Sequence, residues 1–421
     1  NLPHSKVLHT IDEREQICDN CGSTMVKVGE EFVRTEVQFI PAKLKVIDHY
    51  RETYECRSCR KNGTPYMEKA PVPYPPVLHS LASASTITWL IHQKFELSIP
   101  LYRQEKEWEA LGLRLSRATM SNWLLVVYRD WLVHIVHRLK LELLKQRYLH
   151  IDETHVLVLK EPGRKNTSDS YMWVYCSIRD AVNPIRYFEY QPGRSGKYPE
   201  AFLREYEGYI HTDAYSGYNA VSGVKRCLCY THLRRAFVDA LPKDIHNSEA
   251  SKPAEAILRL NQLFNIESEL EALPPDQKKK ERLIREKPLL EAFWSWAEKS
   301  AIGELPKSKL SKAFHYALNN REGFWNYLED GNCSISNSLA ENCIRPFVIG
   351  RKNWLFSGSP KGAEASAGIY TLVETAKANG LAPMKYIKYI LSDMPGSAFL
   401  EHPEYLDDYL PWNPLVKEFC R

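Results

Sequence analysis

The stretch RYLHIDETHVLVLK, residues 147–160, decides the fold that this sequence predicts. Its second half, residues 156–159, consists of valine and leucine and has the length of a buried strand. Asp152 and Glu153 lie near its start, and because side chains alternate along a strand, one can point into a site while the other points away. A carboxylate beside an apolar strand is costly unless it is solvated, paired or bound to a cation. Asp152 is therefore a candidate metal ligand, and a solvent-facing acid at a strand end is the alternative.

The composition indicates a globular protein of several domains. With 421 residues the chain is too long for one typical domain, and 44% hydrophobic residues supply several cores. The formal net charge of +4 is only mildly basic, so the local distribution of charge is more informative than the sum. The longest apolar runs, such as residues 123–128, are too short to cross a bilayer, and no charged-then-apolar leader predicts export.

Four of the ten cysteines form two C-x-x-C knuckles, CDNC at 18–21 and CRSC at 56–59. Their thiolates suit a structural zinc site, with a redox dithiol pair or coincidence as alternatives. The four candidate ligands are Cys18, Cys21, Cys56 and Cys59. Between the knuckles, residues 31–40 and 45–54 predict a β-hairpin that bends at Pro41. We expect a zinc-binding β module over residues 1–70, whose partner is either nucleic acid or protein.

A stiff proline-rich linker opens the next region, residues 71–146, which we expect to be helical. Helical periodicity over 80–97 and 101–111 is followed by a turn at Gly112 and a third helix from Ser116 to about Gln146. A glycine turn between two helices is typical of a helix-turn-helix. The third helix carries Arg117 and Asn122 near its start, residue types that reach bases or phosphates. An ordinary helical hairpin is the alternative.

Further strands are expected after the first one. Two cover residues 171–176 and 185–190, a helix covers 197–206, and a fourth strand over 209–212 ends at Asp213. Strand, strand, strand, helix, strand is the order of the ribonuclease H-like fold, in which the first and fourth strands are neighbours. Asp152 and Asp213 would then face each other, and such like charges repel unless a cation lies between them. Mg²⁺ or Mn²⁺ suits these oxygen ligands; a turn-capping Asp213 is the alternative.

Residues 224–235, VKRCLCYTHLRR, hold four basic residues, no acid and the spacing C-x-x-H at Cys229 and His232. This pair lacks metal-binding partners in the local sequence, so we do not predict zinc there. A phosphate-contacting surface is the functional interpretation, and a solvated basic helix face is the alternative. The chain from about 244 to 320 is rich in lysine, glutamate and leucine without a strand signal, which predicts a helical insertion within residues 236–330.

The third acid of the expected site is Glu341. We expect Asn337 or Ser336 to cap a short helix that carries Glu341 and ends before Pro346. Bases and an aromatic residue are interleaved with apolar residues after this acid: Arg345, Arg351, Lys352, Trp354 and Lys361. An acid on a basic strip suits metal-dependent phosphoryl transfer on nucleic acid, because the carboxylate holds the cation and the bases hold phosphates. A plain helical pair of Glu341 with Arg345 is the alternative.

Four segments together resemble the transposases of insertion-sequence family 66. They are IDET at 151–154, HTDAYSGYNAV at 211–221, CYTHLRRAF at 229–237 and SNSLAENCIRPFVIGRKNWLFSGSPKGAEASA at 336–367. The resemblance covers nearly the whole chain. It implies a ribonuclease H-like core with an Asp-Asp-Glu set, Asp152, Asp213 and Glu341. The core would occupy residues 147–235 and 331–395, before a tail over 396–421. The expected fold class is multidomain α/β: a mixed sheet with a helical insertion, preceded by the zinc module and the helix-turn-helix-like domain.

The activity that the resemblance implies is DNA transposition, with strand cleavage at the element ends and strand transfer into target DNA. Two Mg²⁺ or Mn²⁺ ions would be held by the three acids, and Zn²⁺ would be structural. The residues expected to contact DNA are Arg117, Asn122, His232, Arg234, Arg235, Arg345, Arg351, Lys352 and Trp354. Further implied partners are a second copy or larger assembly and helper proteins, in the bacterial cytoplasm at the nucleoid. An inactive zinc-containing DNA-binding relative and a metal-dependent nuclease without strand transfer are the alternatives.

Overall fold

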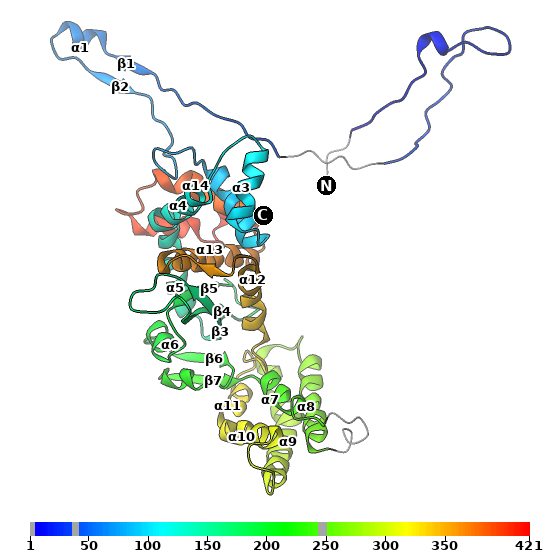
Figure 1. The fold of residues 1–421 in the computed structure, drawn as a ribbon, viewed down its shortest axis with the longest axis vertical. Coiled ribbons are helices and arrows are strands. Elements are labelled where there is room, and N and C mark those ends of the chain that lie inside the picture. The colour runs from blue at the N-terminus through cyan, green and yellow to red at the C-terminus, as the bar shows by residue number, and fades with distance from the viewer. Residues whose placement is uncertain (1–4, 36–41, 243–250) are drawn as a thin grey trace. The chain divides into compact units, whose positions relative to one another are not determined.

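The computed structural model describes residues 5–35, 42–242 and 251–421 (Figure 1). The chain divides into two compact units, Asn1–Ile47 and Asp48–Arg421. The first unit contains a 3-10 turn, Glu13–Glu15, and an antiparallel bridge between Ile17 and Thr24. None of the described helices is both long enough and apolar enough to cross a membrane.

The second unit begins with two short antiparallel strands, β1 (Thr53–Glu55) and β2 (Met67–Lys69), on either side of helix α1 (Arg57–Lys61). The hairpin predicted over 31–54 is wrong for the described part of that segment, where only residues 53 and 54 lie in a strand. Residues 36–41, including the predicted bend, lie outside the described residues. The observed pairing instead closes residues 56–66, which contain the second cysteine knuckle and α1.

The predicted helices that follow are confirmed, and capping residues explain where they start. They are α2 (Ala84–Ile91), the π-helical turn His92–Glu96, α3 (Leu101–Ala110), α4 (Arg117–Val127), the π-helical turn Tyr128–Leu132 and α5 (Val133–Leu144). The Oγ of Ser116 accepts a hydrogen bond from the N–H of Thr119 (3.1 Å) and so caps α4. Gly112 has a φ of +92°, which turns the chain between α3 and α4.

A mixed sheet with the strand order β5-β4-β3-β6-β7, and β8 beside β3, lies at the centre of this unit. The strands are β3 (Tyr148–Val158), β4 (Asp169–Ser177), β5 (Arg186–Gln191), β6 (Gly208–Thr212), β7 (Val224–Leu228) and β8 (Phe356–Ser357). The predicted antiparallel meander β3-β4-β5 is confirmed, and β6 and β7 run parallel to β3. Strand β7 corrects the interpretation of residues 224–235 as one helix face: only α7 (Tyr230–Val238) is helical there. This edge strand was not predicted because Lys225 and Arg226 interrupt its run of apolar residues.

Helices cover both faces of the sheet. On one face, Phe202 of α6 (Lys197–Phe202) stacks on Tyr175 of β4 with ring centroids 3.6 Å apart. The next residue of β4, Cys176, points to the other face, where its thiol meets Cys343 of α12 (Ser338–Trp354). Along the free edge of β5, α13 (Pro360–Ala378) supplies Thr371, whose Oγ1 accepts a hydrogen bond from the N–H of Phe188 (2.8 Å). This contact protects the edge from pairing with another strand.

Helix α12 is longer than the sequence predicted, because it passes through Pro346 and ends at Trp354. The proline removes the hydrogen bond that its N–H would make to the carbonyl of Asn342, a residue on the exposed side of the helix. Opposite lies a buried apolar stripe: Ala340, Ile344, Phe347 and Gly350. Burial of that stripe outweighs the lost bond, so the helix continues.

The helical insertion is confirmed, and its described residues contain no strand. It comprises α8 (Lys252–Glu269), α9 (Pro275–Ala301), α10 (Lys309–Asn319) and α11 (Arg321–Trp325), gathered beside α7 and β7 in Figure 1. These helices form a core of their own with α7, which includes Phe237, Leu260, Phe293, Trp294 and Phe314. Helices α14 (Pro383–Asp393) and α15 (Pro414–Cys420) follow α13.

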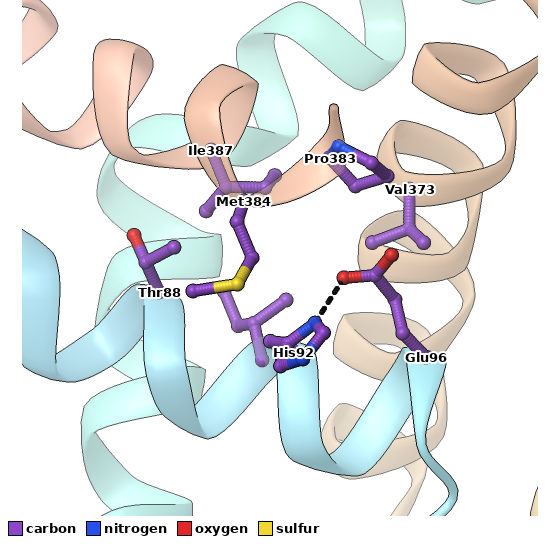
Figure 2. Close-up of a pocket in the computed structure, with 8 residues that line it drawn as sticks. Thr88, His92, Glu96, Val373, Pro383, Met384 and Ile387 are labelled. Carbon is purple, nitrogen blue, oxygen red and sulfur yellow. Dashed lines mark hydrogen bonds and ion pairs between the residues drawn. The ribbon is translucent and has the colours of Figure 1, made fainter. Parts of the chain in front are cut away.

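A small pocket lies where α2 and the turn after it meet α13 and α14 (Figure 2). Its ionisable groups satisfy each other, since the Nδ1 of His92 lies 2.5 Å from a carboxylate oxygen of Glu96. Apolar side chains such as Val373 and Met384 form much of the remaining lining. No predicted site residue lines this pocket, so we interpret it as part of the helix packing.

Candidate active site

The register of the sheet brings Asp152 and Asp213 to the same level. Strands β3 and β6 are parallel neighbours in which His150 pairs with His211, and the two imidazole rings stack with centroids 4.2 Å apart. Each aspartate lies two residues beyond its histidine. Because side chains alternate along a strand, this spacing predicts that both acids share the face of the stacked rings. The predicted adjacency of the first and fourth strands is therefore confirmed.

The pairing of β3 with β4 separates Asp152 from Glu153. Opposite residues of antiparallel strands share a face, and Asp152 is opposite Val174, two residues before the cysteine that meets α12. Glu153 points to the other face, where a guanidinium nitrogen of Arg194 lies 2.6 Å from its carboxylate and the hydroxyl of Tyr218 donates to it. The sequence interpretation named Asp152, not Glu153, as the candidate ligand, and the register places Asp152 on the face of the sheet that α12 covers.

Helix α12 carries Glu341 to this same face. The residue before the helix, Asn337, is buried, and its side chain holds β3: its Nδ2 donates to the carbonyl of Ile151 (2.7 Å), and its Oδ1 lies 3.0 Å from the Nδ1 of His150. The N–H of Asn337 donates to the Sγ of Cys229 (3.1 Å). One residue thus fixes the start of α12 to β3 and to the start of α7, which positions Glu341 in the first turn.

The three acids interact electrostatically. Burial, followed by the negative charges of Glu153, Asp213 and Glu341, raises the pKa of Asp152 to about 8. The N–H of Glu153, which donates to Asp152 (2.9 Å), opposes this effect only in part. Glu341 Oε1 is buried and has no hydrogen-bond donor among the described residues. A hard divalent cation such as Mg²⁺ or Mn²⁺ would offset the repulsion at Asp152, but the ligand atoms of the three acids do not all lie within 4.8 Å of one another in the described structure.

Replacing Asp152 by asparagine is expected to stabilise the metal-free protein increasingly as the pH rises from about 4 to about 8. In this interval the folded protein keeps a proton on Asp152 that the unfolded chain releases, since the pKa is raised from 3.8 to about 8. The free energy of unfolding of the wild type therefore falls with pH, and that of the variant lacks this contribution. The difference grows by at most about 1.4 kcal/mol per pH unit. Urea unfolding in chelator measures it; a pH-independent difference contradicts the assignment, and Asp239→Asn, at an exposed position, is the control.

Two basic side chains of α7 lie beside Glu341. Nη2 of Arg235 lies 3.8 Å from its Oε2, and Nδ1 of His232 lies 3.6 Å from its Oε1. Arg345 and Lys352 are exposed on α12, the helix that carries the acid. Seven of the nine predicted DNA-contacting residues lie on α7 and α12, and these four either lie beside Glu341 or are exposed.

Three other predicted DNA contacts have partners within the protein. The guanidinium of Arg234 donates to an asparagine of α8 (2.7 Å), and that of Arg351 donates to the Oγ1 of Thr154 on β3 (3.0 Å). The indole of Trp354 packs edge-on against Phe347, with centroids 5.4 Å apart. Their observed contacts join α7 to α8 and α12 to the sheet, and contact with DNA stays a prediction for them.

The remaining predicted contacts, Arg117 and Asn122, lie on α4 and are both exposed. The N–H of Arg117 donates to a carboxylate oxygen of Glu105 on α3 (3.1 Å), which places an acid at the start of α4. These two residues therefore belong to the helix-turn-helix-like segment, not to the two helices beside Glu341.

In each cysteine knuckle local hydrogen bonds lower the pKa of one thiol, whereas the side-chain hydrogen bond with Cys56 raises the pKa of Cys59. In the first unit the N–H of Cys18 donates to the carbonyl of Ser23 (2.9 Å), and hydrogen bonds from Ser23 lower the pKa of Cys21. In the second unit a hydrogen bond from the backbone of Cys59 lowers the pKa of Cys56. Thiolate is the form that binds zinc, so each knuckle fits half of the predicted ligand set.

The sequence interpretation missed the role of Arg226, which it counted only among the basic residues of a surface segment. Its guanidinium donates to the carbonyls of Asp213 (2.6 Å) and Tyr215 (2.8 Å) and to the Oγ1 of Thr212 (2.7 Å). These bonds hold the end of β6 in place. Arg226 thus positions the backbone that presents Asp213.

Comparison with known proteins identifies relatives along most of the chain. A family model described as "Transposase IS66 family" matches residues 79–365, more than half of the chain. A second model, "zinc-finger binding domain of transposase IS66", matches residues 15–60, which include both cysteine knuckles. Two similar proteins of Sinorhizobium fredii are described as uncharacterized. The protein y4hP is 27% identical over 95% of this chain and 75% of its own length, and y4jD is 26% identical over 98% and 80%.

Proposed function

This chain belongs to the IS66 family of DDE transposases, a family of DNA-binding enzymes of DNA transposition, and from this premise we propose that Asp152, Asp213 and Glu341 are its catalytic acids. The observation that carries the proposal is the convergence of acids from β3, the end of β6 and α12. Burial and the charge of Glu153 raise the pKa of Asp152 most, and the charges of Asp213 and Glu341 raise it further, which supports their proximity to Asp152. Glu153, adjacent in sequence, is paired on the opposite face and has no part in this set.

We assign the sheet to the ribonuclease H-like fold. Three antiparallel strands followed by two parallel strands, in the order β5-β4-β3-β6-β7, support this assignment. The core would comprise residues 147–235 and 331–395, interrupted by the insertion over 236–330 and followed by the tail over 396–421. The zinc module would comprise residues 1–70 and the helix-turn-helix-like region residues 71–146.

The reaction consists of two in-line phosphoryl displacements at one site. Water first displaces the 3′-oxygen of the element end from phosphorus. The freed 3′-hydroxyl then attacks a phosphodiester of target DNA, from which the 3′-oxygen of the target strand leaves as a hydroxyl. Two divalent cations held by the three acids would supply Lewis-acid stabilisation of the attacking and leaving oxygens. Asn337 and Arg226 keep Glu341 and Asp213 in place.

Basic residues beside the acids would hold the scissile strand. Arg235 lies beside Glu341, Arg345 follows it by four residues on α12, and Lys352 lies near the end of that helix. All three are exposed and so can reach phosphates, which position DNA without specifying its sequence. Arg117 and Asn122 on α4 would contact a different part of the DNA.

The amino-terminal match supports Zn²⁺ in this chain. We propose that Cys18, Cys21, Cys56 and Cys59 hold one zinc ion together, as four thiolates do in structural zinc sites. Joining two element ends to one target would require at least a dimer, with helper proteins as further partners, at the bacterial nucleoid in the cytoplasm.

Incubation of the full-length protein with DNA fragments from either side of its gene tests this function. We expect Mg²⁺- or Mn²⁺-dependent strand cuts that leave 3′-hydroxyls, and joined products when a target plasmid is added. Both should disappear with chelator. Cuts without joined product would indicate a nuclease, and DNA binding without cuts would indicate an inactive DNA-binding relative. Either result would overturn the proposal.

A further inference from the structure

We propose that Cys229, His232 and Glu341 form a binding site for a transition-metal ion of the zinc type. Their ligand atoms, the Sγ, an imidazole nitrogen and a carboxylate oxygen, all lie within 4.8 Å of one another. Cys229 and His232 come from the start of α7, whereas Glu341 comes from the first turn of α12. Folding therefore brings Glu341 of α12 next to the C-x-x-H pair, which has no third ligand in its local sequence.

The distance between two of these ligands matches a shared ion better than a hydrogen bond. His232 Nδ1 and Glu341 Oε1 are 3.6 Å apart, beyond the usual range of about 2.7–3.2 Å for a hydrogen bond. Two zinc bonds of about 2.0–2.1 Å at a tetrahedral angle would separate their ligand atoms by roughly 3.4 Å. Both atoms are buried and have no hydrogen-bond partner in the described structure. Buried polar atoms that face each other without a bond are costly unless a third group binds both.

Burial raises the pKa of the Cys229 thiol, and three backbone N–H groups that face the sulfur oppose this effect. Its Sγ accepts a hydrogen bond from the N–H of Asn337 (3.1 Å), and the backbone N–H groups of Thr231 and His232 also point at it from the first turn of α7. Such N–H groups stabilise negative charge on sulfur. The N–H of Asn337, directly before α12, is thus one of the groups that would stabilise a metal-bound thiolate at Cys229.

A second cluster contains a histidine whose two ring nitrogens both have hydrogen-bond partners. His211, Cys227 and Cys333 also place their ligand atoms within 4.8 Å of one another and are fully buried. Both ring nitrogens of His211 are already used, because Nδ1 lies 3.2 Å from the carbonyl of Leu149 and Nε2 accepts from the N–H of Ser334 (2.9 Å). No lone pair is left for a metal there, so this cluster is the natural control.

The ligand set selects the class of ion. Thiolate and imidazole are poor ligands for Mg²⁺ and good ones for Zn²⁺, and three protein ligands leave a fourth position for water. The site shares Glu341 with the proposed catalytic set, but it does not depend on that proposal, since it would bind its metal in the absence of DNA and Mg²⁺.

Zinc content tests the site in the full-length protein, dialysed without DNA or Mg²⁺ and measured by plasma mass spectrometry. We expect Cys229→Ser and His232→Gln each to hold one zinc ion fewer per chain than the wild type, whatever the amino-terminal cysteines hold. Cys227→Ser, which removes a buried thiol from the control cluster, should keep the wild-type content. Equal content in all four proteins would overturn the proposal.

Cobalt spectroscopy gives a measurement that leaves the three residues intact. In a variant with Cys18, Cys21, Cys56 and Cys59 all replaced by serine, we expect added Co²⁺ to give a sulfur-to-cobalt charge-transfer band of one thiolate per chain. The additional change Cys229→Ser should remove it. Absence of the band in the four-serine variant, with its secondary structure preserved by circular dichroism, would overturn the proposal even if single replacements at the site prevent folding. Neither readout uses DNA cleavage, so failure here leaves the proposed function untouched.

Discussion

Asp152→Asn is expected to lower the rate of metal-dependent DNA cleavage by at least about a thousandfold while DNA affinity stays within about twofold. Asparagine keeps the shape of the side chain and removes its charge, so the cations would lose one of three anionic ligands. A loss of about 4 kcal/mol of transition-state stabilisation corresponds to that factor. Asp213→Asn should behave alike, because the sheet register places both acids at one level. Single-turnover cleavage and electrophoretic mobility shifts on the same DNA measure the two effects.

Two comparisons make that result specific. Because Asp152 carries a raised pKa, its replacement should stabilise the fold at neutral pH, so lost cleavage could not be attributed to unfolding. The double variant Asp152→Asn/Asp213→Asn should be little worse than either single one, since acids that act as a unit are not additive. Asp239→Asn, an exposed position directly after α7, should cleave as the wild type does. Metal-dependent cleavage that persists in Asp152→Asn would contradict the catalytic assignment.

The strands that carry Asp152 and Asp213 could be predicted from the sequence because their residue types give strong local signals. Valine, isoleucine and aromatic residues in runs bounded by polar turns identify β3 to β6, and Asp152 and Asp213 stand out as acids at the ends of such runs. Their adjacency followed from strand order alone. Glu341 was harder to place, and the sequence identified it through the long motif around it, which resembles one family.

Other features depend on contacts between segments that are distant in sequence. Whether Asp152 or Glu153 enters the site is decided by the register of β3 against β4, which no local pattern encodes. Strand β7 is an edge strand with two charged residues, so it resembled a polar surface segment. The third partner of Cys229 and His232 comes from α12, beyond the whole insertion. The predicted end of α12 before Pro346 was wrong because the helix is stabilised by contacts of its buried face with other parts of the fold, which the local sequence does not show.

The insertion itself is connected to the segment before α12 by a buried arginine of α9. Arg282 is fully buried, and its guanidinium binds both carboxylate oxygens of Glu267 on α8. It also donates to the carbonyls of Tyr327, Asp330 and Cys333, at 3.1, 3.1 and 2.8 Å. Those carbonyls belong to the segment that leads into α12, so a single side chain fixes the path from the insertion to Glu341.

Arg282→Met is expected to lower the free energy of unfolding by about 3–5 kcal/mol, the cost of leaving one member of a buried ion pair without its partner. Methionine fills a similar volume, so the effect reports the lost charge and hydrogen bonds more than a cavity. Lys278, whose Nζ lies 3.4 Å from Glu267, would compensate only in part because it cannot reach the three carbonyls in the arginine's place. Chemical unfolding followed by circular dichroism measures the difference.

A neighbour on the same helix gives the matched control. Arg285 pairs with Glu269 across α8 and α9, as Arg282 does with Glu267, but at the surface, where such a pair contributes about 0.2–1 kcal/mol. Arg285→Met should therefore cost far less than Arg282→Met. In the double variant Arg282→Met/Glu267→Leu the buried charge is removed together with its partner, so part of the stability should return. Equal costs at positions 282 and 285 would show that the buried arginine does not hold the insertion to the segment before α12.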